Sequence, residues 1–186
     1  MRLGVLVSGR GSNLEAILDA GLPVALVVSN RHGVRALAVA ADRAVPSVVL
    51  ARSAFPSADA RDAAIGAALV RADVQLAVLA GYDRLLRPAY FRAFGGRTVN
   101  IHPSLLPAHG GPGMVGLAVH QSVLAAGEKE TGATVHEVTA DLDAGPILAQ
   151  VRVPVRPGED AESLAARVLA QEHRLLVETL RALTGA

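Results

Sequence analysis

Two polar side chains stand where an apolar segment of the chain ends. Asn100 and His102 lie two residues apart within Thr98–His102, a stretch of strand-like composition, and Pro103 follows at once. On an extended backbone, side chains at positions i and i+2 point to the same face. Proline donates no ladder hydrogen bond and keeps the preceding residue extended, so the strand is predicted to end before it. An amide and an imidazole held in this way can donate hydrogen bonds to an oxygen on which negative charge develops.

A pair of carboxylates offers a partner for that imidazole. Asp141 and Asp143 lie two residues apart on a short connection, Thr139–Pro146, which ends in a Gly-Pro turn signal. One carboxylate beside His102 would keep the imidazole protonated or orient its tautomer. The alternative without a function is that Asn100 and His102 hydrogen-bond to loop backbone groups at the end of the strand and that Asp141 and Asp143 are solvated turn residues.

A glycine-bearing turn, Ser8–Asn13, follows the first apolar segment and precedes a helical pattern. Such a turn aims backbone N–H groups at an anion, and the helix dipole adds to the attraction, so a phosphate site is predicted. The turn is not a dinucleotide fingerprint, because Leu14 occupies the place of the third glycine and no acid follows the second strand. The structural alternative is a capping box, since Ser12 and Glu15 stand at the required spacing.

Strand-like and helical segments alternate along the chain, which predicts an α/β fold with a Rossmann-like, doubly wound, mostly parallel sheet. Two late segments, Thr131–Val138 and Ile147–Val153, are joined by a short polar connection and are expected to pair as an antiparallel edge. Ligands of such sheets bind beyond the carboxyl ends of the strands, where the polar residues above are found. The other expected strands are Leu3–Val7, Pro23–Val28, Ser47–Leu50, Val74–Leu79 and Thr98–Ile101, and the expected helices are Leu14–Ala20, Val34–Ala41, Ser57–Val70, Pro88–Phe94, Leu117–Ala126 and Asp160–Leu183.

Composition narrows the class of protein. The 186 residues are expected to form a single domain, 1–186, and a chain without cysteine is expected in the cytoplasm. A net charge of +1 and 3% aromatic residues do not favour a nucleic-acid partner, and no apolar run is long enough to cross a membrane. A metal site is the competing possibility, but the candidate histidines have no spacing diagnostic of zinc, so no metal is expected. Those candidates are His102, His109, His120 and His136.

Several segments together resemble the folate-dependent formyltransferases. The chain carries Asn100-Ile-His-Pro-Ser-Leu-Leu-Pro107 with Leu142-Asp-Ala-Gly-Pro-Ile147 downstream, and it opens with Val5-Leu-Val-Ser-Gly-Arg-Gly-Ser-Asn-Leu14. With Leu79–Leu86, Thr131–His136 and Gln171–His173, nearly the whole chain resembles the phosphoribosylglycinamide formyltransferases of purine biosynthesis. The resemblance implies a formyltransferase fold and transfer of the formyl group of 10-formyltetrahydrofolate, a co-substrate, to the amine of glycinamide ribonucleotide. We expect these two small molecules as partners of a monomer or homodimer.

The resemblance also implies roles for individual residues. His102 would be the proton donor, Asn100 would stabilise the oxyanion made by amine attack, and Asp143 would complete the catalytic trio. Residues expected to bind the ribonucleotide are Gly11, Ser12 and Asn13 at the phosphate and Glu172 at the ribose hydroxyls. Residues expected to bind folate are Asp83, Arg84, Leu85, Leu86 and Asn100, with Ala140 and Asp141 in a loop that closes over it.

The chain departs from the family pattern in three places. Asp83 stands where many members carry an apolar residue, and the loop Ala108–Gly116 is longer than in the shortest members. An arginine that some members place against the folate tail falls on Ala58, with Arg61 as the nearest replacement. The remaining alternatives are a methionyl-tRNA formyltransferase or a formyltetrahydrofolate deformylase, for whose extra domains this chain has no room, and a silent nucleotide-binding module.

Overall fold

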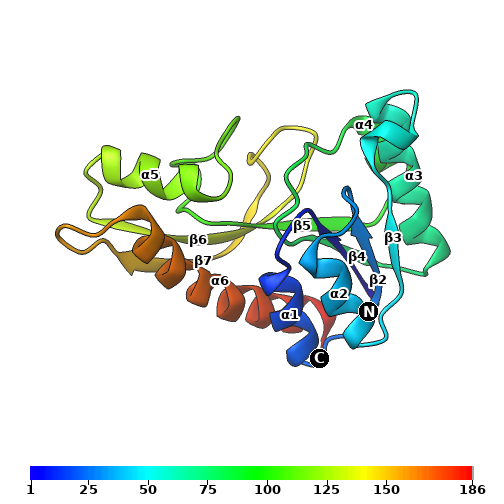
Figure 1. Ribbon diagram of the computed structural model, residues 1–186, viewed down its shortest axis with the longest axis horizontal. Helices are drawn as coiled ribbons and strands as arrows, with labels where there is room; N and C mark the ends of the chain where they lie inside the picture. The colour runs from blue at the N-terminus through cyan, green and yellow to red at the C-terminus, as the bar shows by residue number, and fades with distance from the viewer. Residues whose placement is uncertain (186) are drawn as a thin grey trace. The chain divides into compact units, whose positions relative to one another are not determined.

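The computed structural model describes residues 1–185, and these residues form one seven-stranded sheet and six α-helices (Figure 1). The strands are β1 (Leu3–Val7), β2 (Val24–Ser29), β3 (Ser47–Val49), β4 (Leu76–Leu79), β5 (Arg97–His102), β6 (Glu130–Glu137) and β7 (Ile147–Pro154). The helices are α1 (Ser12–Asp19), α2 (Arg35–Asp42), α3 (Ala58–Arg71), α4 (Pro88–Phe94), α5 (Leu117–Ala125) and α6 (Ala161–Thr184), with a short 3₁₀ helix η1 (Arg52–Ala54).

The strand order β3-β2-β1-β4-β5-β6-β7 confirms the predicted α/β class. β1 pairs in parallel with both β2 and β4, β2 pairs in parallel with β3, and β6 pairs with β7 antiparallel. The sheet is therefore mostly parallel with one antiparallel edge. The expected elements agree with the observed ones to within about two residues at each end, and β5 ends at His102 as the following proline requires.

The chain divides into two compact units, the first of which comprises residues 1–99 with the C-terminal residues from Leu183. All five residues of β1 and all four of β4 are buried, as expected for parallel strands covered on both faces. Within this unit α3 packs against α4, and Gly66 lies at their contact. A Cβ at Gly66 would lie 2.7 Å from the Cβ of Ala93, so glycine permits the close approach of the two helices.

The second unit, residues 100–182, contains the end of β5, the β6–β7 hairpin, α5 and most of α6. Gly132 on β6 faces the backbone of β7, where a Cβ would lie 1.9 Å from the carbonyl oxygen of Val151. Buried residues recur at every fourth position along α6, which is the spacing of one helix face. They are Leu164, Val168, Glu172, Leu176 and Leu180, so a carboxylate interrupts an apolar stripe.

Candidate active site

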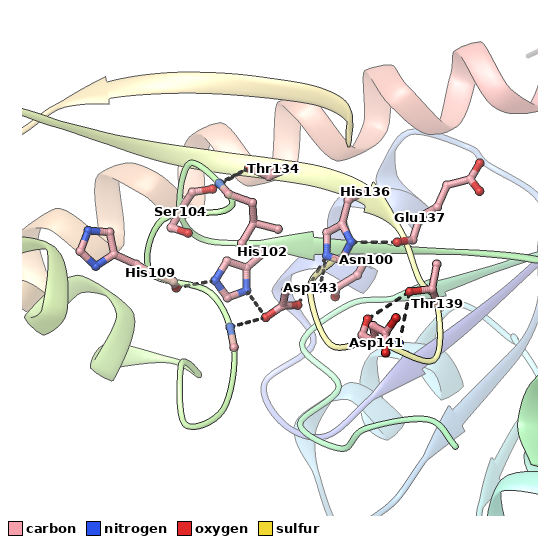
Figure 2. A network of polar contacts seen from close by, with 12 residues as sticks. Asn100, His102, Ser104, His109, Thr134, His136, Glu137, Thr139, Asp141 and Asp143 are labelled. Atoms are coloured by element: carbon pink, nitrogen blue, oxygen red, sulfur yellow. Dashed lines mark hydrogen bonds and ion pairs between the residues drawn. The ribbon is translucent and has the colours of Figure 1, made fainter. Parts of the chain in front are cut away.

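The end of β5 and the loop between β6 and β7 bring the three predicted catalytic residues together within the second unit (Figure 2). His102 is 4% exposed, and its Nδ1 lies 4.0 Å from Oδ2 of Asp143. The other carboxylate oxygen of Asp143 lies 3.6 Å from Nε2 of His136, which is 3.0 Å from Nδ2 of Asn100. Asn100 and His102 therefore face one carboxylate–histidine network, as their spacing on an extended strand predicts.

His136 is the member of this network to which sequence reasoning gave no catalytic role. It lies on β6, 2% exposed, and its Nδ1 is 2.9 Å from the carbonyl oxygen of Glu137. A carbonyl only accepts, so Nδ1 carries the proton and Nε2 carries a lone pair. Burial is the main cause that lowers the pKa of His136, which favours this neutral form. Nε2 therefore accepts from the Asn100 amide and fixes which way that amide points.

The two ring nitrogens of His102 both face acceptors. Nε2 lies 2.9 Å from the carbonyl oxygen of His109 and donates to it, while Nδ1 faces the Asp143 carboxylate. The imidazolium form, with a proton on each nitrogen, satisfies both neighbours. The separation of 4.0 Å is an ion-pair distance rather than a hydrogen bond, so Nδ1 is the less tightly held of the two ring nitrogens.

Asp143 also forms a hydrogen bond with the backbone of the Gly-rich loop Ala108–Gly116. Its Oδ2 accepts a hydrogen bond of 2.9 Å from the backbone N–H of Gly111. Asp143 itself has φ 52°, a left-handed conformation that turns the chain sharply between β6 and β7. Asp141 is exposed instead, and its backbone N–H and carbonyl both bond to the Thr139 hydroxyl. Of the two loop aspartates, Asp143 is the one that the structure places beside His102.

In the first unit, the glycine-bearing turn starts α1 without a capping side chain. Gly11 is the N-cap residue at φ 79°, and a Cβ there would lie 2.7 Å from Cα of Ala36, so only glycine fits. Ser12 is already helical, and Glu15 pairs with Arg35 at 3.1 Å. The capping-box explanation is therefore wrong, because the N-cap residue is Gly11, which has no side chain to cap the helix.

Asp83 connects the carboxyl ends of three strands within the same unit. Its Oδ1 accepts from Nδ2 of Asn30 at 2.8 Å, its Oδ2 pairs with Arg31, and its backbone N–H donates to the Ser8 hydroxyl at 3.0 Å. Burial by itself would raise the pKa of Asp83, but hydrogen bonds from Asn30 and Ser8 and the nearby Arg31 and Arg84 together lower it. The charged side chain at this unusual position is therefore satisfied by the protein.

Neighbouring folate candidates differ in exposure. Leu85 is 48% exposed, whereas Leu86 is buried. Arg61 is 4% exposed. Its Nε and Nη2 donate hydrogen bonds of 2.9 and 2.6 Å to Oδ1 of Asp62. A buried, paired guanidinium cannot reach a folate tail, so the expectation that Arg61 replaces the missing arginine is wrong.

Residues 1–185 carry neither a metal-binding cluster nor a membrane-spanning helix. This part of the chain holds no group of three or more His, Cys, Asp or Glu side chains arranged to bind a metal ion. None of its helices combines the length and the apolar character needed to cross a membrane.

Comparisons with known proteins agree on one family. The formyl transferase family model matches residues 1–180. The chain is 46% identical over 186 residues to a phosphoribosylglycinamide formyltransferase of Mycobacterium tuberculosis, covering 98% of this chain and 84% of that protein. It is 42% identical over 180 residues to a trifunctional purine biosynthetic protein of Drosophila pseudoobscura, but it spans only 13% of that protein's length.

Solved structures give the same result. A glycinamide ribonucleotide transformylase of Symbiobacterium toebii matches 97% of this chain and 86% of its own, with a TM-score of 0.91 at 43% identity. A phosphoribosylglycinamide formyltransferase of Brucella melitensis matches 100% of this chain and 96% of its own, with a TM-score of 0.89 at 42% identity. Sequence and fold lead to the same conclusion: the chain belongs to the formyl transferase family.

Proposed function

We propose that this chain is a phosphoribosylglycinamide formyltransferase, which transfers the formyl group of 10-formyltetrahydrofolate to the amine of glycinamide ribonucleotide in purine biosynthesis. The observation that carries the proposal is the setting of His102, whose Nδ1 faces Asp143 while Asn100 lies two residues away on the same strand. Relatives that bear this name cover nearly the whole chain and support the choice of substrates.

The reaction needs a donor for an oxyanion, a proton for the leaving nitrogen and a base for the attacking amine. The amine attacks the formyl carbon, and the Asn100 amide hydrogen not given to His136 stabilises the resulting oxyanion. His102 then protonates the folate nitrogen through Nδ1 as the carbon–nitrogen bond to folate breaks. Asp143 takes up the proton lost by the amine, directly or through water, and can return it to His102, which restores the starting state.

The substrate-binding assignments belong to the same proposal. The turn at Gly11, Ser12 and Asn13 presents backbone N–H groups to the phosphate, and Glu172 accepts from the ribose hydroxyls. Glu172 is a buried carboxylate on the otherwise apolar stripe of α6, a place where an acid is uncommon, and this supports a functional role for it. The backbone of residues 83–86, with Asn100, Ala140 and Asp141, holds the folate heterocycle.

The test is an absorbance assay of formyl transfer with the purified chain and 10-formyl-5,8-dideazafolate, run with and without glycinamide ribonucleotide and with a chelator. Turnover that requires the ribonucleotide and survives the chelator is expected. Folate turnover without the ribonucleotide would indicate a deformylase instead. Binding of the ribonucleotide without any turnover would indicate a silent binding module.

A further inference from the structure

The backbone carbonyl of His109 contacts His102, the proposed catalytic histidine. The side chain of His109 contacts residues on and just beyond α5. The residue has φ 54°, in the left-handed region that few residues other than glycine adopt, although histidine, asparagine and aspartate adopt it more often than most. Its Nδ1 lies 2.8 Å from the Ser122 hydroxyl on α5, and its Nε2 lies 3.7 Å from Oε1 of Glu128 just beyond that helix. The imidazole is thus hydrogen-bonded at Nδ1, and its Nε2 lies at ion-pair distance from a carboxylate.

The preceding turn is fixed as well. The hydroxyl of Ser104, a fully buried residue, donates a hydrogen bond of 2.6 Å to the carbonyl oxygen of Ala108. The next carbonyl, that of His109, is the one that accepts from Nε2 of His102 at 2.9 Å (Figure 2). Two consecutive carbonyls are therefore placed, one by a buried serine and one by the anchored histidine.

The position of this carbonyl decides where His102 keeps its proton. A neutral imidazole carries one N–H, and a carbonyl oxygen can only accept, so the proton of the neutral ring remains on Nε2. Nδ1 is then the nitrogen that gains and loses the proton, and it is the nitrogen that faces Asp143. The same logic governs catalytic histidines whose second ring nitrogen is oriented by a fixed acceptor.

We propose that His109 is a positioning residue for His102: its anchored side chain holds a left-handed turn whose carbonyl fixes the tautomer and orientation of the imidazole. The inference rests on the proposed function, because it assumes that His102 transfers a proton. It goes beyond that function by giving a role to the Gly-rich loop, which carries the carbonyl, and to Ser122 and Glu128, which hold it.

The first experiment compares His109→Gly with His109→Asn. Glycine accepts the left-handed backbone but removes both anchors, whereas asparagine also tolerates that backbone and places an amide nitrogen near the position of Nδ1, within reach of Ser122. We expect kcat to fall about 10- to 100-fold in the glycine variant, because general acid catalysis contributes roughly 100- to 10,000-fold and only its alignment is impaired. KM for both substrates should stay within about twofold, and the asparagine variant should recover most of kcat.

The matched control is Asp73→Gly. Asp73 also has a left-handed backbone, with φ 55°, and its side chain also bonds locally, to Gln75, but it follows α3 in the first unit. This variant should keep the wild-type kcat. A His109→Gly protein with kcat within twofold of wild type would overturn the inference.

A second readout does not depend on turnover. The ¹⁵N chemical shifts of the His102 ring nitrogens, assigned by comparison with His102→Ala, report which nitrogen carries the proton when the ring is neutral. We expect the Nε2–H form in the wild-type protein and a mixture of tautomers in His109→Gly; an unchanged Nε2–H form in the variant would overturn the inference. Failure of the proposed function is distinguishable, because the wild-type protein would then show no ribonucleotide-dependent turnover whatever the tautomer measurement shows.

Discussion

At the scale of single side chains, the orientation of the Asn100 amide depends on His136, a histidine that stays neutral and accepts a hydrogen bond from the amide. The His136 proton is committed to the Glu137 carbonyl, so Nε2 can only accept from the amide. If His136 became charged, Nε2 would donate to Asp143 instead and would repel the amide hydrogens. The neutral state of this buried ring is thus part of what presents Asn100 as a donor.

Replacement of His136 should therefore impair Asn100 without removing it. In His136→Ala we expect kcat to fall, but by less than in Asn100→Ala, for which loss of one oxyanion donor costs about 100- to 1000-fold. Because the two residues act as one unit, the double variant should be no worse than Asn100→Ala alone. Steady-state kinetics on the three proteins measures this, and fully additive losses in the double variant would contradict the pairing.

His102 and Asp143, the residues proposed to transfer protons, give a second prediction for single side chains. In His102→Ala and Asp143→Ala we expect kcat to fall about 100-fold or more, because general acid–base catalysis contributes roughly 100- to 10,000-fold. Binding of the ribonucleotide and of a folate analogue, measured by calorimetry, should change far less. Near-native turnover in both variants would remove His102 and Asp143 from the mechanism.

At the scale of elements, the loops after β1, β2 and β4 meet at one carboxylate. The Asp83 side chain satisfies Asn30 and Arg31, and its backbone bonds to Ser8. In Asp83→Ala these donors lose a charged acceptor, so we expect the free energy of unfolding to fall by about 1–3 kcal/mol, as is typical when a buried group, here the Asn30 amide, is left unpaired. Asp19→Ala is the control, because its pairing with Arg43 is exposed and should contribute less than about 1 kcal/mol. Urea denaturation of both variants checks the difference, and equal effects would mean that the Asp83 contacts add nothing beyond a surface pair.

The contact between α3 and α4 provides another prediction for elements. Gly66→Ala places a methyl group 2.7 Å from Ala93 Cβ and 2.9 Å from the backbone nitrogen of Phe94. Alanine favours a helix by about 1 kcal/mol over glycine, but overpacking typically costs about 1–3 kcal/mol. We expect net destabilisation in a thermal melt, because backbone atoms cannot yield as a flexible side chain would. A melting temperature above that of the wild-type protein would show that the helices separate readily.

At the scale of the whole molecule, the regular alternation of apolar strands and amphipathic helices was enough to predict the sheet, its mostly parallel pairing and its antiparallel edge. The positions of Asn100 and His102 on one strand face also followed from spacing alone. The contacts of His136 and His109 did not, because they depend on which strands lie side by side and on the loops that bring residues 109 and 143 to residues 100 and 136. Three of the Asp83 partners, Ser8, Asn30 and Arg31, likewise come from 52 and more positions away, and no local sequence pattern predicts them.

The pH dependence of folding stability is a property of the whole molecule that these buried groups determine. Burial is the main cause that lowers the pKa of both His120 and His136 from 6.5, so the unfolded chain binds their protons more readily than the folded one. Stability from these rings is therefore fully present above pH 6.5 and is lost as the pH falls below it. Asp83 and Glu159, whose pKa values are lowered from 3.8 and 4.5, act only at still lower pH.

Urea denaturation at several pH values between 5 and 7.5 measures stability over the range in which the buried histidines, and not the carboxylates, change protonation. The unfolding free energy of the wild-type protein should decrease as the pH falls through that range. His120→Phe, which replaces a buried ring of similar shape without a titrating nitrogen, should show a shallower decrease. An exposed histidine offers the control, since His32→Phe should leave the slope unchanged. If the His120 variant kept the full slope, burial of that ring would not be a source of the acid sensitivity.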